Sequence, residues 1–292
     1  MNSVQLWMKA VRPYAYSASL VPVAIGGLQA RAAGAVFSGW RFGVSLVAGL
    51  LLHTAANLWN DYYDFRHGVD RKGRGEGSGV LVHGEMTPAR CYRGAVISAA
   101  LALMGGLWLA WQVGWALIWL GAAGLVGAWA YSAGPCSPKH HALGEVWVFL
   151  MMGAGMTLGG YMAQTGRFSW SAIAAGVPAA LLMTLLLYTN NLRDLSSDRA
   201  AGLHTLAMQL RPTEAKLLAG VFLAVPYLMT GLMAATRLLP MATLAALLTL
   251  PLGVAWFRGV WSGPVAEPHV VGMARLHLLF GLLFAAGLWW GG

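Results

Sequence analysis

An apolar segment over residues 40–60 runs into the stretch Asn57-Leu-Trp-Asn-Asp-Tyr-Tyr-Asp-Phe-Arg-His-Gly-Val-Asp70, and a second, 171–190, runs into Tyr188-Thr-Asn-Asn-Leu-Arg-Asp-Leu-Ser-Ser-Asp-Arg199. These two stretches contain all five aspartates of the chain. A carboxylate is costly near hydrocarbon, so aspartates gathered at the ends of apolar segments indicate a functional site. The surrounding sequence determines what kind of fold presents that site.

The composition predicts an integral membrane protein. The chain is 58% hydrophobic and 10% charged, whereas a soluble domain carries roughly 25% charged residues. The chain has nine apolar segments whose length is near the ~20 residues needed to cross a bilayer. None of them alternates apolar and polar residues as a β-barrel strand does. They are 14–33, 40–60, 94–112, 115–133, 143–163, 171–190, 215–235, 240–257 and 271–290. We therefore predict an all-α bundle of about nine transmembrane helices that forms a single domain, 1–292.

The lysines and arginines predict its orientation. With a cytoplasmic N-terminus, fifteen of the nineteen fall on the inside, as the positive-inside rule requires. Segments 40–60 and 171–190 are both even-numbered, so both aspartate stretches emerge on the cytoplasmic face of a cell (inner) membrane. The net charge of +9 then favours anionic lipid or an anionic substrate. Nucleic acid is not expected, because there is no soluble basic domain to bind it.

The spacing within each stretch places its polar side chains on one helix face. Asn57, Asp61 and Asp64 lie at i, i+4 and i+7, which share a face. The set Asn190, Asp194 and Asp198 repeats this pattern at i, i+4 and i+8. Carboxylate and amide oxygens suit Mg²⁺, which binds few carboxylates together with substrate phosphate.

Basic residues are interleaved with these aspartates. They are Arg66, Arg71, Lys72, Arg74, Lys139, Arg193 and Arg199. Acidic and basic groups in one patch fit a metal-bound diphosphate, since the metal bridges carboxylate to phosphate and the cations neutralise the remaining oxygens. Asn57, Asn60 and Asn190 are further candidate substrate-binding side chains. The simpler alternative is that Asp and Arg only pair with each other at the membrane edge.

These residues resemble the UbiA superfamily of intramembrane aromatic prenyltransferases. Its motif Asn-Asp-x-x-Asp is matched by Asn60-Asp61-Tyr-Tyr-Asp64, and Asp-x-x-x-Asp-x-x-x-Gly by Asp194, Asp198 and Gly202. The form with Asp at 70 is similar to the branch of 1,4-dihydroxy-2-naphthoate polyprenyltransferases in menaquinone synthesis. Tyr131-Ser-Ala-Gly-Pro135 also fits the family, whereas His204 stands where it usually has lysine.

The resemblance implies a mechanism. Mg²⁺ would be held by Asp61, Asp64, Asp70, Asp194 and Asp198, of which four (Asp61, Asp64, Asp194 and Asp198) would be catalytic. A polyprenyl diphosphate would lose its pyrophosphate and the allylic cation would attack an electron-rich aromatic ring. Loss of the carboxylate would follow if that ring is a hydroxynaphthoate. Aromatic faces can stabilise the cation, and the candidates for this are Tyr131, Tyr161 and Tyr188.

Three alternatives stay open at the level of sequence. The acceptor could be a hydroxybenzoate, a porphyrin-like ring or a lipid alcohol. A secondary transporter would bind its substrate near the bilayer midplane, but no span carries an acidic residue at its middle. A purely structural membrane subunit would not need the paired aspartate stretches.

Overall fold

The computed structural model describes residues 2–73, 76–134 and 137–291, and Arg74 and Pro135, named above, lie outside these ranges. Within the described ranges the chain forms helices and no strand, and its few isolated bridge residues include the pair His141 and His204. The predicted all-α class is thus confirmed.

The helices follow the apolar segments closely. Their bounds are α1 Ser3–Val11, η1 Pro13–Ala15, α2 Ser17–Ala32, α3 Gly39–Arg66, α4 Pro88–Val113, α5 Ala116–Ala130, η2 Pro138–His140, α6 Gly144–Val148, η3 Phe149–Gly155, α7 Met156–Thr165, α8 Trp170–Arg193, α9 Leu195–Ala200, η4 Leu206–Gln209, α10 Pro212–Ala235, η5 Met241–Thr249, α11 Leu250–Ser262 and α12 Glu267–Gly291. The helices α6, η3 (a π-helix) and α7 follow one another directly over Gly144–Thr165.

Seven helical runs among the described residues are long and apolar enough to cross a membrane. They are α3, α4, Gly144–Thr165, α8, α10, Met241–Ser262 and α12. The two other predicted segments coincide with α2, of 16 residues, and α5, of 15 residues. At 1.5 Å per residue these fall short of a ~30 Å hydrocarbon core, so length alone supports seven crossings.

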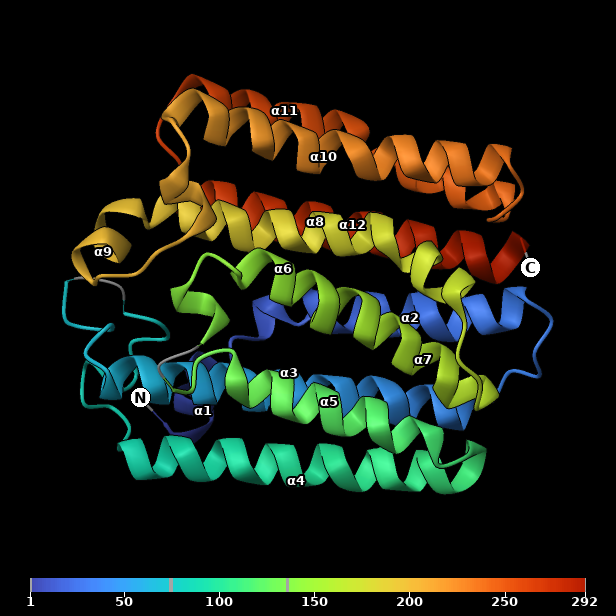
Figure 1. Ribbon diagram of the computed structural model, residues 1–292, viewed down its shortest axis with the longest axis horizontal. Helices are drawn as coiled ribbons and strands as arrows, with labels where there is room; N and C mark the ends of the chain where they lie inside the picture. The colour runs from blue at the N-terminus through green and yellow to red at the C-terminus, as the bar shows by residue number, and fades with distance from the viewer. Residues whose placement is uncertain (1, 74–75, 135–136, 292) are drawn as a thin grey trace.

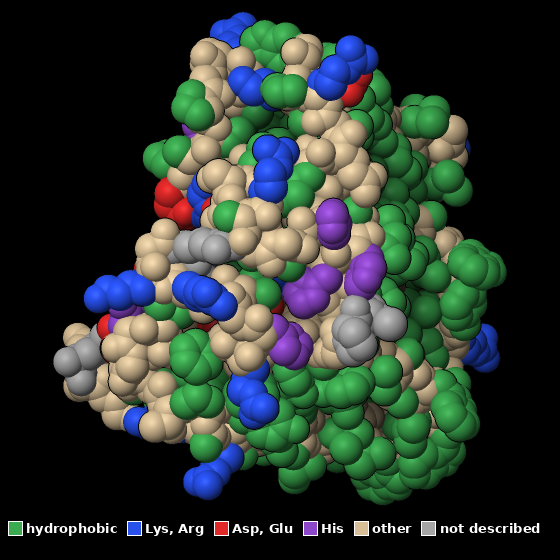
Figure 2. All heavy atoms as spheres, turned by 60° about the vertical axis from the view of Figure 1, so that its left-hand side comes forward, with side chains coloured by type: hydrophobic (Ala, Val, Ile, Leu, Met, Phe, Trp, Pro, Cys, Tyr) green, Lys and Arg blue, Asp and Glu red, His purple; other side chains and the backbone are tan. Residues whose placement is uncertain are grey.

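The long helices run side by side along the longest axis of the molecule (Figure 1). The N-terminus, α9 and the connection between α3 and α4 lie at one end, and the C-terminus lies at the other (Figure 1). Viewed towards the first end, lysine, arginine and histidine side chains gather there, while the flank is largely hydrophobic (Figure 2). Helices α3 and α8 both point their C-terminal ends at this charged end.

Helix α8 forms the centre of the bundle, since 61% of its apolar window is buried, against 28% for α4. Its side chains Leu182 and Leu185 pack in one core with Phe280 and Phe284 of α12. The outward side chains of α4 and α5, including Trp111 and Trp119, are exposed and are suited to lipid.

Helices α2 and α7 cross with their backbones in direct contact. A Cβ on Gly26 would lie 1.8 Å from the Thr157 carbonyl oxygen, and one on Gly160 would lie 2.2 Å from that of Val23. Glycine is therefore required on both helices at this crossing, as is common where helices pack closely in membranes. This contact fixes α7 against the N-terminal part of the chain.

Candidate active site

The first aspartate cluster consists of Asp61, Asp64 and Asp70, and each is held by a different set of partners. Asp61, on the last turns of α3, is only 2% exposed. It forms an ion pair with Arg12 and accepts a hydrogen bond from the Ser78 hydroxyl. Arg12 reaches it because α1 ends there in a left-handed turn, with φ of 54°, and Pro13 redirects the chain.

Asp64 lies one turn further along α3 and is 1% exposed. It pairs with Lys139 of η2, and its Oδ2 accepts a 2.9 Å hydrogen bond from Asn60. Burial alone would lower the pKa of Lys139, but the charge of Asp64 outweighs it and raises that pKa. The other oxygen of Asp64, Oδ1, is buried and has no hydrogen-bond partner among the described residues. This acceptor is left for a ligand.

Asp70 joins the cluster through Gly77. The φ of Gly77 is +57°, and a Cβ built on it would lie 2.5 Å from Asp70 Oδ2 and 2.7 Å from Asp61 Oδ1. Only glycine fits between these two carboxylates. Burial, and after it the charge of Asp64, raises the pKa of Asp70 to about 7. The cluster therefore carries more buried negative charge than its partners compensate, which favours binding of a cation.

The second aspartate cluster, Asp194 and Asp198, lies where α8 gives way to α9. Arg193 donates to both oxygens of Asp194 at 2.7 and 2.6 Å, and also pairs with Glu267 at the start of α12. Asp198 stands one turn further on. Burial, and then the charge of Asp194, raises the pKa of Asp198 to about 6.

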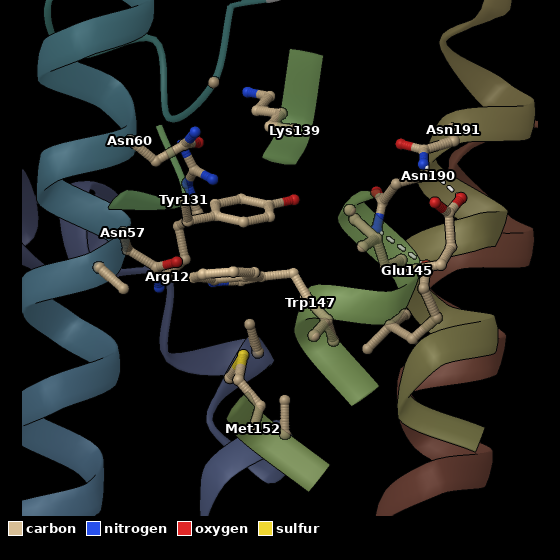
Figure 3. Close-up of a pocket in the computed structure, with 18 of the residues that line it drawn as sticks. Arg12, Asn57, Asn60, Tyr131, Lys139, Glu145, Trp147, Met152, Asn190 and Asn191 are labelled. Carbon is tan, nitrogen blue, oxygen red and sulfur yellow. Dashed lines mark hydrogen bonds between the residues drawn. The ribbon is translucent and has the colours of Figure 1, made fainter. Parts of the chain in front are cut away.

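Four of the five aspartates face one cavity of about 590 Å³, and Asp61, paired with Arg12, is not on its wall. Asp64, Asp70, Asp194 and Asp198 line it together with Arg12, Asn57, Asn60, Tyr131, Lys139, Asn190 and Arg193. The convergence of the two aspartate stretches that the sequence predicts is thus confirmed as geometry. Figure 3 shows Asn57, Asn60 and Arg12 on one side of the cavity and Asn190 and Asn191 on the other.

The inner part of the cavity is apolar. Met151 and Met152 of η3, Met156 and Met183 line it, with Leu52 and Ala128. A π-helix inserts an extra residue per turn and is frequent at functional sites, and here it brings methionines to the wall. Methionine is flexible and adapts to irregular apolar ligands. The site thus joins a charged mouth to an apolar interior.

Some predicted site residues lie elsewhere. Tyr188 was expected to face the cation, but it is fully buried in the core, where its hydroxyl donates to the Ala215 carbonyl at 3.1 Å and its ring packs on Phe222. Among the described residues, the cavity wall includes neither Tyr188 nor Tyr161. The side chains of Arg66, Lys72 and Arg199 are exposed and also lie outside it. Tyr188 is therefore corrected to a core residue.

Sequence reasoning missed part of the site as well. Arg12 is not among the residues that the sequence predicts for the site, and Ser78 and Gly77 carry no spacing signal that links them to Asp61. The position of Arg12, directly before proline at the end of a short helix, was the one local hint. Arg12 lies 49 residues before Asp61, whereas Gly77 and Ser78 belong to the connection that follows α3, and all three reach Asp61 through the fold.

The residues present fit a divalent metal. As it stands, no group of three or more His, Cys, Asp or Glu in the described part of the chain is arranged to hold an ion. However, the donors are carboxylate and amide oxygens, which suit Mg²⁺, and Asp64 Oδ1 is a buried acceptor without a partner. Arg12, Lys139 and Arg193 form ion pairs with the carboxylates. A bound metal would compete for these carboxylates, and a phosphate would compete for these cations.

With this geometry in place, comparison with known proteins defines the class. Residues 19–279 match the UbiA prenyltransferase family, so this chain belongs to that family and is a UbiA-type prenyltransferase. Together with its long apolar helices, this makes it a multi-pass membrane protein.

Two individual proteins of this family are similar to the chain over most of its length. The chain is 33% identical over 292 residues to UbiA prenyltransferase domain-containing protein 1 of Mus musculus, covering 97% of this chain and 83% of that one. It is 27% identical over 288 residues to 1,4-dihydroxy-2-naphthoate octaprenyltransferase of Bacillus subtilis (strain 168), covering 97% and 92%.

Solved structures share the fold. The apo structure of a UbiA homolog from Aeropyrum pernix K1 superposes with a TM-score of 0.72 at 19% identity, covering 95% of this chain and 97% of that one. A UbiA homolog from Archaeoglobus fulgidus bound to GPP and Mg²⁺ gives 0.66 at 16% identity, covering 96% and 99%. At these identities the likeness establishes the bundle architecture.

Proposed function

We propose that this protein transfers a polyprenyl group from a polyprenyl diphosphate to 1,4-dihydroxy-2-naphthoate, with loss of the carboxylate, as in menaquinone biosynthesis. The observation that carries the proposal is the convergence of both aspartate clusters, with Lys139 and Arg193, on the mouth of a cavity whose inner wall is apolar. A charged mouth suits a diphosphate and an apolar interior suits a prenyl chain.

Two observations support this acceptor. The first is the form of the motif, Asn60-Asp61-Tyr-Tyr-Asp64 with a further aspartate at Asp70. The second is the similarity to a naphthoate octaprenyltransferase over 97% of the chain. A second candidate is the same transfer to a different acceptor, such as a hydroxybenzoate or a lipid alcohol. It is favoured by the higher identity to relatives whose name specifies no acceptor.

The side chains of the site divide the reaction between them. Lys139 and Arg193 neutralise the diphosphate oxygens as the allylic carbon–oxygen bond breaks. Tyr131 presents an aromatic face to the developing cation, and the methionine-lined wall excludes the water that would quench it. The five aspartates, with Asn60 and Asn190, would hold Mg²⁺, which supplies positive charge to the diphosphate when bound.

The proposal also includes the placement in the membrane. Lysine and arginine side chains gather at the charged end (Figure 2), and by the positive-inside rule this end would face the cytoplasm. We propose nine crossings, with α2 and α5 as the short ones, a cytoplasmic N-terminus and a location in the cell inner membrane. The partners are then polyprenyl diphosphate, the aromatic acceptor and the lipid bilayer, without nucleic acid.

The test uses the purified protein in detergent with Mg²⁺, a polyprenyl diphosphate and 1,4-dihydroxy-2-naphthoate, with products identified by mass spectrometry. We expect a prenylated, decarboxylated naphthoquinol that disappears when EDTA is added. Release of pyrophosphate with prenylation of another acceptor only would favour the second candidate. No turnover of any prenyl diphosphate would overturn both.

A further inference from the structure

Glu145 is a buried carboxylate in the wall of the cavity. The reaction outlined above assigns it no role. It lies in the first turn of α6, is 3% exposed and lines the cavity. The other four glutamates of the chain are all more exposed than this. Burial of a carboxylate is costly unless its oxygens accept hydrogen bonds. The hydrogen-bond partners of Glu145 therefore indicate its role.

The partners of Glu145 satisfy only one of its two oxygens. Asn191 of α8 donates from Nδ2 to Oε1 at 2.8 Å, and the backbone N–H of Glu145 also faces the carboxylate. Oε2 is buried and has no hydrogen-bond partner among the described residues, and Glu145 takes part in none of the ion pairs found there. A buried acceptor without a donor is rare in native proteins and points to a ligand that supplies one.

The surroundings of Glu145 suit a flat ring. Figure 3 shows the rings of Tyr131 and Trp147 in the space between Asn57 and Glu145, with the Tyr131 hydroxyl directed to the Glu145 side. That hydroxyl lies 3.7 Å from the position of a Cβ on Gly144, the neighbour of Glu145. Trp147 is fixed by a 3.1 Å hydrogen bond to the Gly127 carbonyl. An aromatic acceptor in this space would have aromatic side chains beside it.

We infer that Glu145 binds a hydroxyl group of the aromatic acceptor through Oε2 and removes its proton, while Asn191 positions the carboxylate. The inference rests on the proposed prenyl transfer and deepens it, because it requires a phenol-type acceptor. The O–H proton passes to Glu145, and the ring gains the electron density of a phenolate. An electron pair of the ring then forms the new carbon–carbon bond to the prenyl group. The electron pair of the allylic carbon–oxygen bond, which breaks, leaves with pyrophosphate. Loss of CO₂ returns its electron pair to the ring and restores the phenolate, and Glu145 then returns the proton to that oxygen, which gives the neutral quinol.

The test compares Glu145→Gln with the wild-type enzyme and with Glu85→Gln, a surface carboxamide control. Gln keeps the acceptor for Asn191 but cannot take a proton. With 1,4-dihydroxy-2-naphthoate, Mg²⁺ and a prenyl diphosphate, we expect kcat/KM for the acceptor to fall about 100-fold, the usual size of a lost general base. The KM for the donor should stay within about twofold. The rate of Glu145→Gln should rise with pH as the acceptor ionises by itself, and Glu145→Asp should restore part of the activity.

The outcomes separate this inference from the proposed function. If wild-type enzyme is active and a folded Glu145→Gln matches it in acceptor kinetics and pH profile, Glu145 is structural and the inference is wrong. If wild-type enzyme prenylates no phenol, the proposed function itself fails. Should Glu145→Gln not fold, methyl ethers of the acceptor hydroxyls test the wild-type enzyme directly. We expect one ether to lose turnover, and equal turnover of all ethers would overturn the inference.

Discussion

Replacing Lys139 with methionine should destabilise the Mg²⁺-free protein, because it removes the cation that faces a buried carboxylate. The side chain of Asp64 is 2% exposed and that of Lys139 is 24% exposed. After the substitution, Oδ2 of Asp64 keeps only the 2.9 Å hydrogen bond from Asn60. Methionine has a similar length, so packing changes little and the lost charge dominates.

The magnitude follows from the burial of the pair. Breaking one partner of a buried ion pair costs about 3–5 kcal/mol. Lys139 is partly exposed, so we expect the lower end, about 3 kcal/mol, or roughly 6–12 °C in the unfolding midpoint. Replacing Asp64 with asparagine in addition removes the uncompensated charge. The double variant Asp64→Asn/Lys139→Met should therefore regain most of the lost stability.

The assay is thermal unfolding in detergent with EDTA, followed by the fluorescence of the fourteen tryptophans. Lys9→Met is the matched control, since Lys9 pairs with Glu85 at the surface, where the two side chains are 35% and 33% exposed. Such a pair is worth about 0–1 kcal/mol. A midpoint of Lys139→Met equal to that of Lys9→Met, or a double variant as unstable as the single one, would refute the reasoning.

Further outcomes are expected at three positions. Asp194→Asn should lower pyrophosphate release at least about 100-fold while the protein stays folded, because the Asp194 side chain is 34% exposed; retained release would remove Asp194 from the metal site. Gly77→Ala should cost about 1–3 kcal/mol and raise the Mg²⁺ concentration for half-maximal activity, since its Cβ would meet Asp70 at 2.5 Å. Gly73→Ala, also at positive φ but with no atom within 4 Å, should leave that concentration unchanged. Tyr188→Phe should cost about 1 kcal/mol for its buried hydrogen bond with kcat unaltered, and a large loss of kcat in a folded Tyr188→Phe would return Tyr188 to the site.

Sequence patterns were most reliable where the physics is local. Each of the nine apolar segments became a helix or a run of helices, because hydropathy over about twenty residues depends on the segment alone. The convergence of the aspartate clusters was also predictable, since two even-numbered segments end on the same side of a bundle. The cavity lined by Asp64 and Asp194 bears this out.

Individual roles were harder to predict where a side chain has two possible directions. Tyr188 shares its turn with Asn190 and Asn191, yet it points to the core and packs on Phe222. The sequence position of Tyr188 is compatible with a side chain in the cavity or in the core. Which of the two occurs depends on the elements that pack against each face of α8. The helices α2 and α5, at 16 and 15 residues, are also shorter than the predicted segments 14–33 and 115–133.

The sequence by itself determined a helical membrane bundle and the two aspartate clusters at one end, because composition and periodicity act over short distances. Only the tertiary structure decided which cation meets which carboxylate. Arg12 reaches Asp61 across 49 residues, Lys139 reaches Asp64 across 75, and Asn191 reaches Glu145 across 46. Such pairs form because helix packing brings their elements together, and no local pattern in the chain encodes which surfaces will touch.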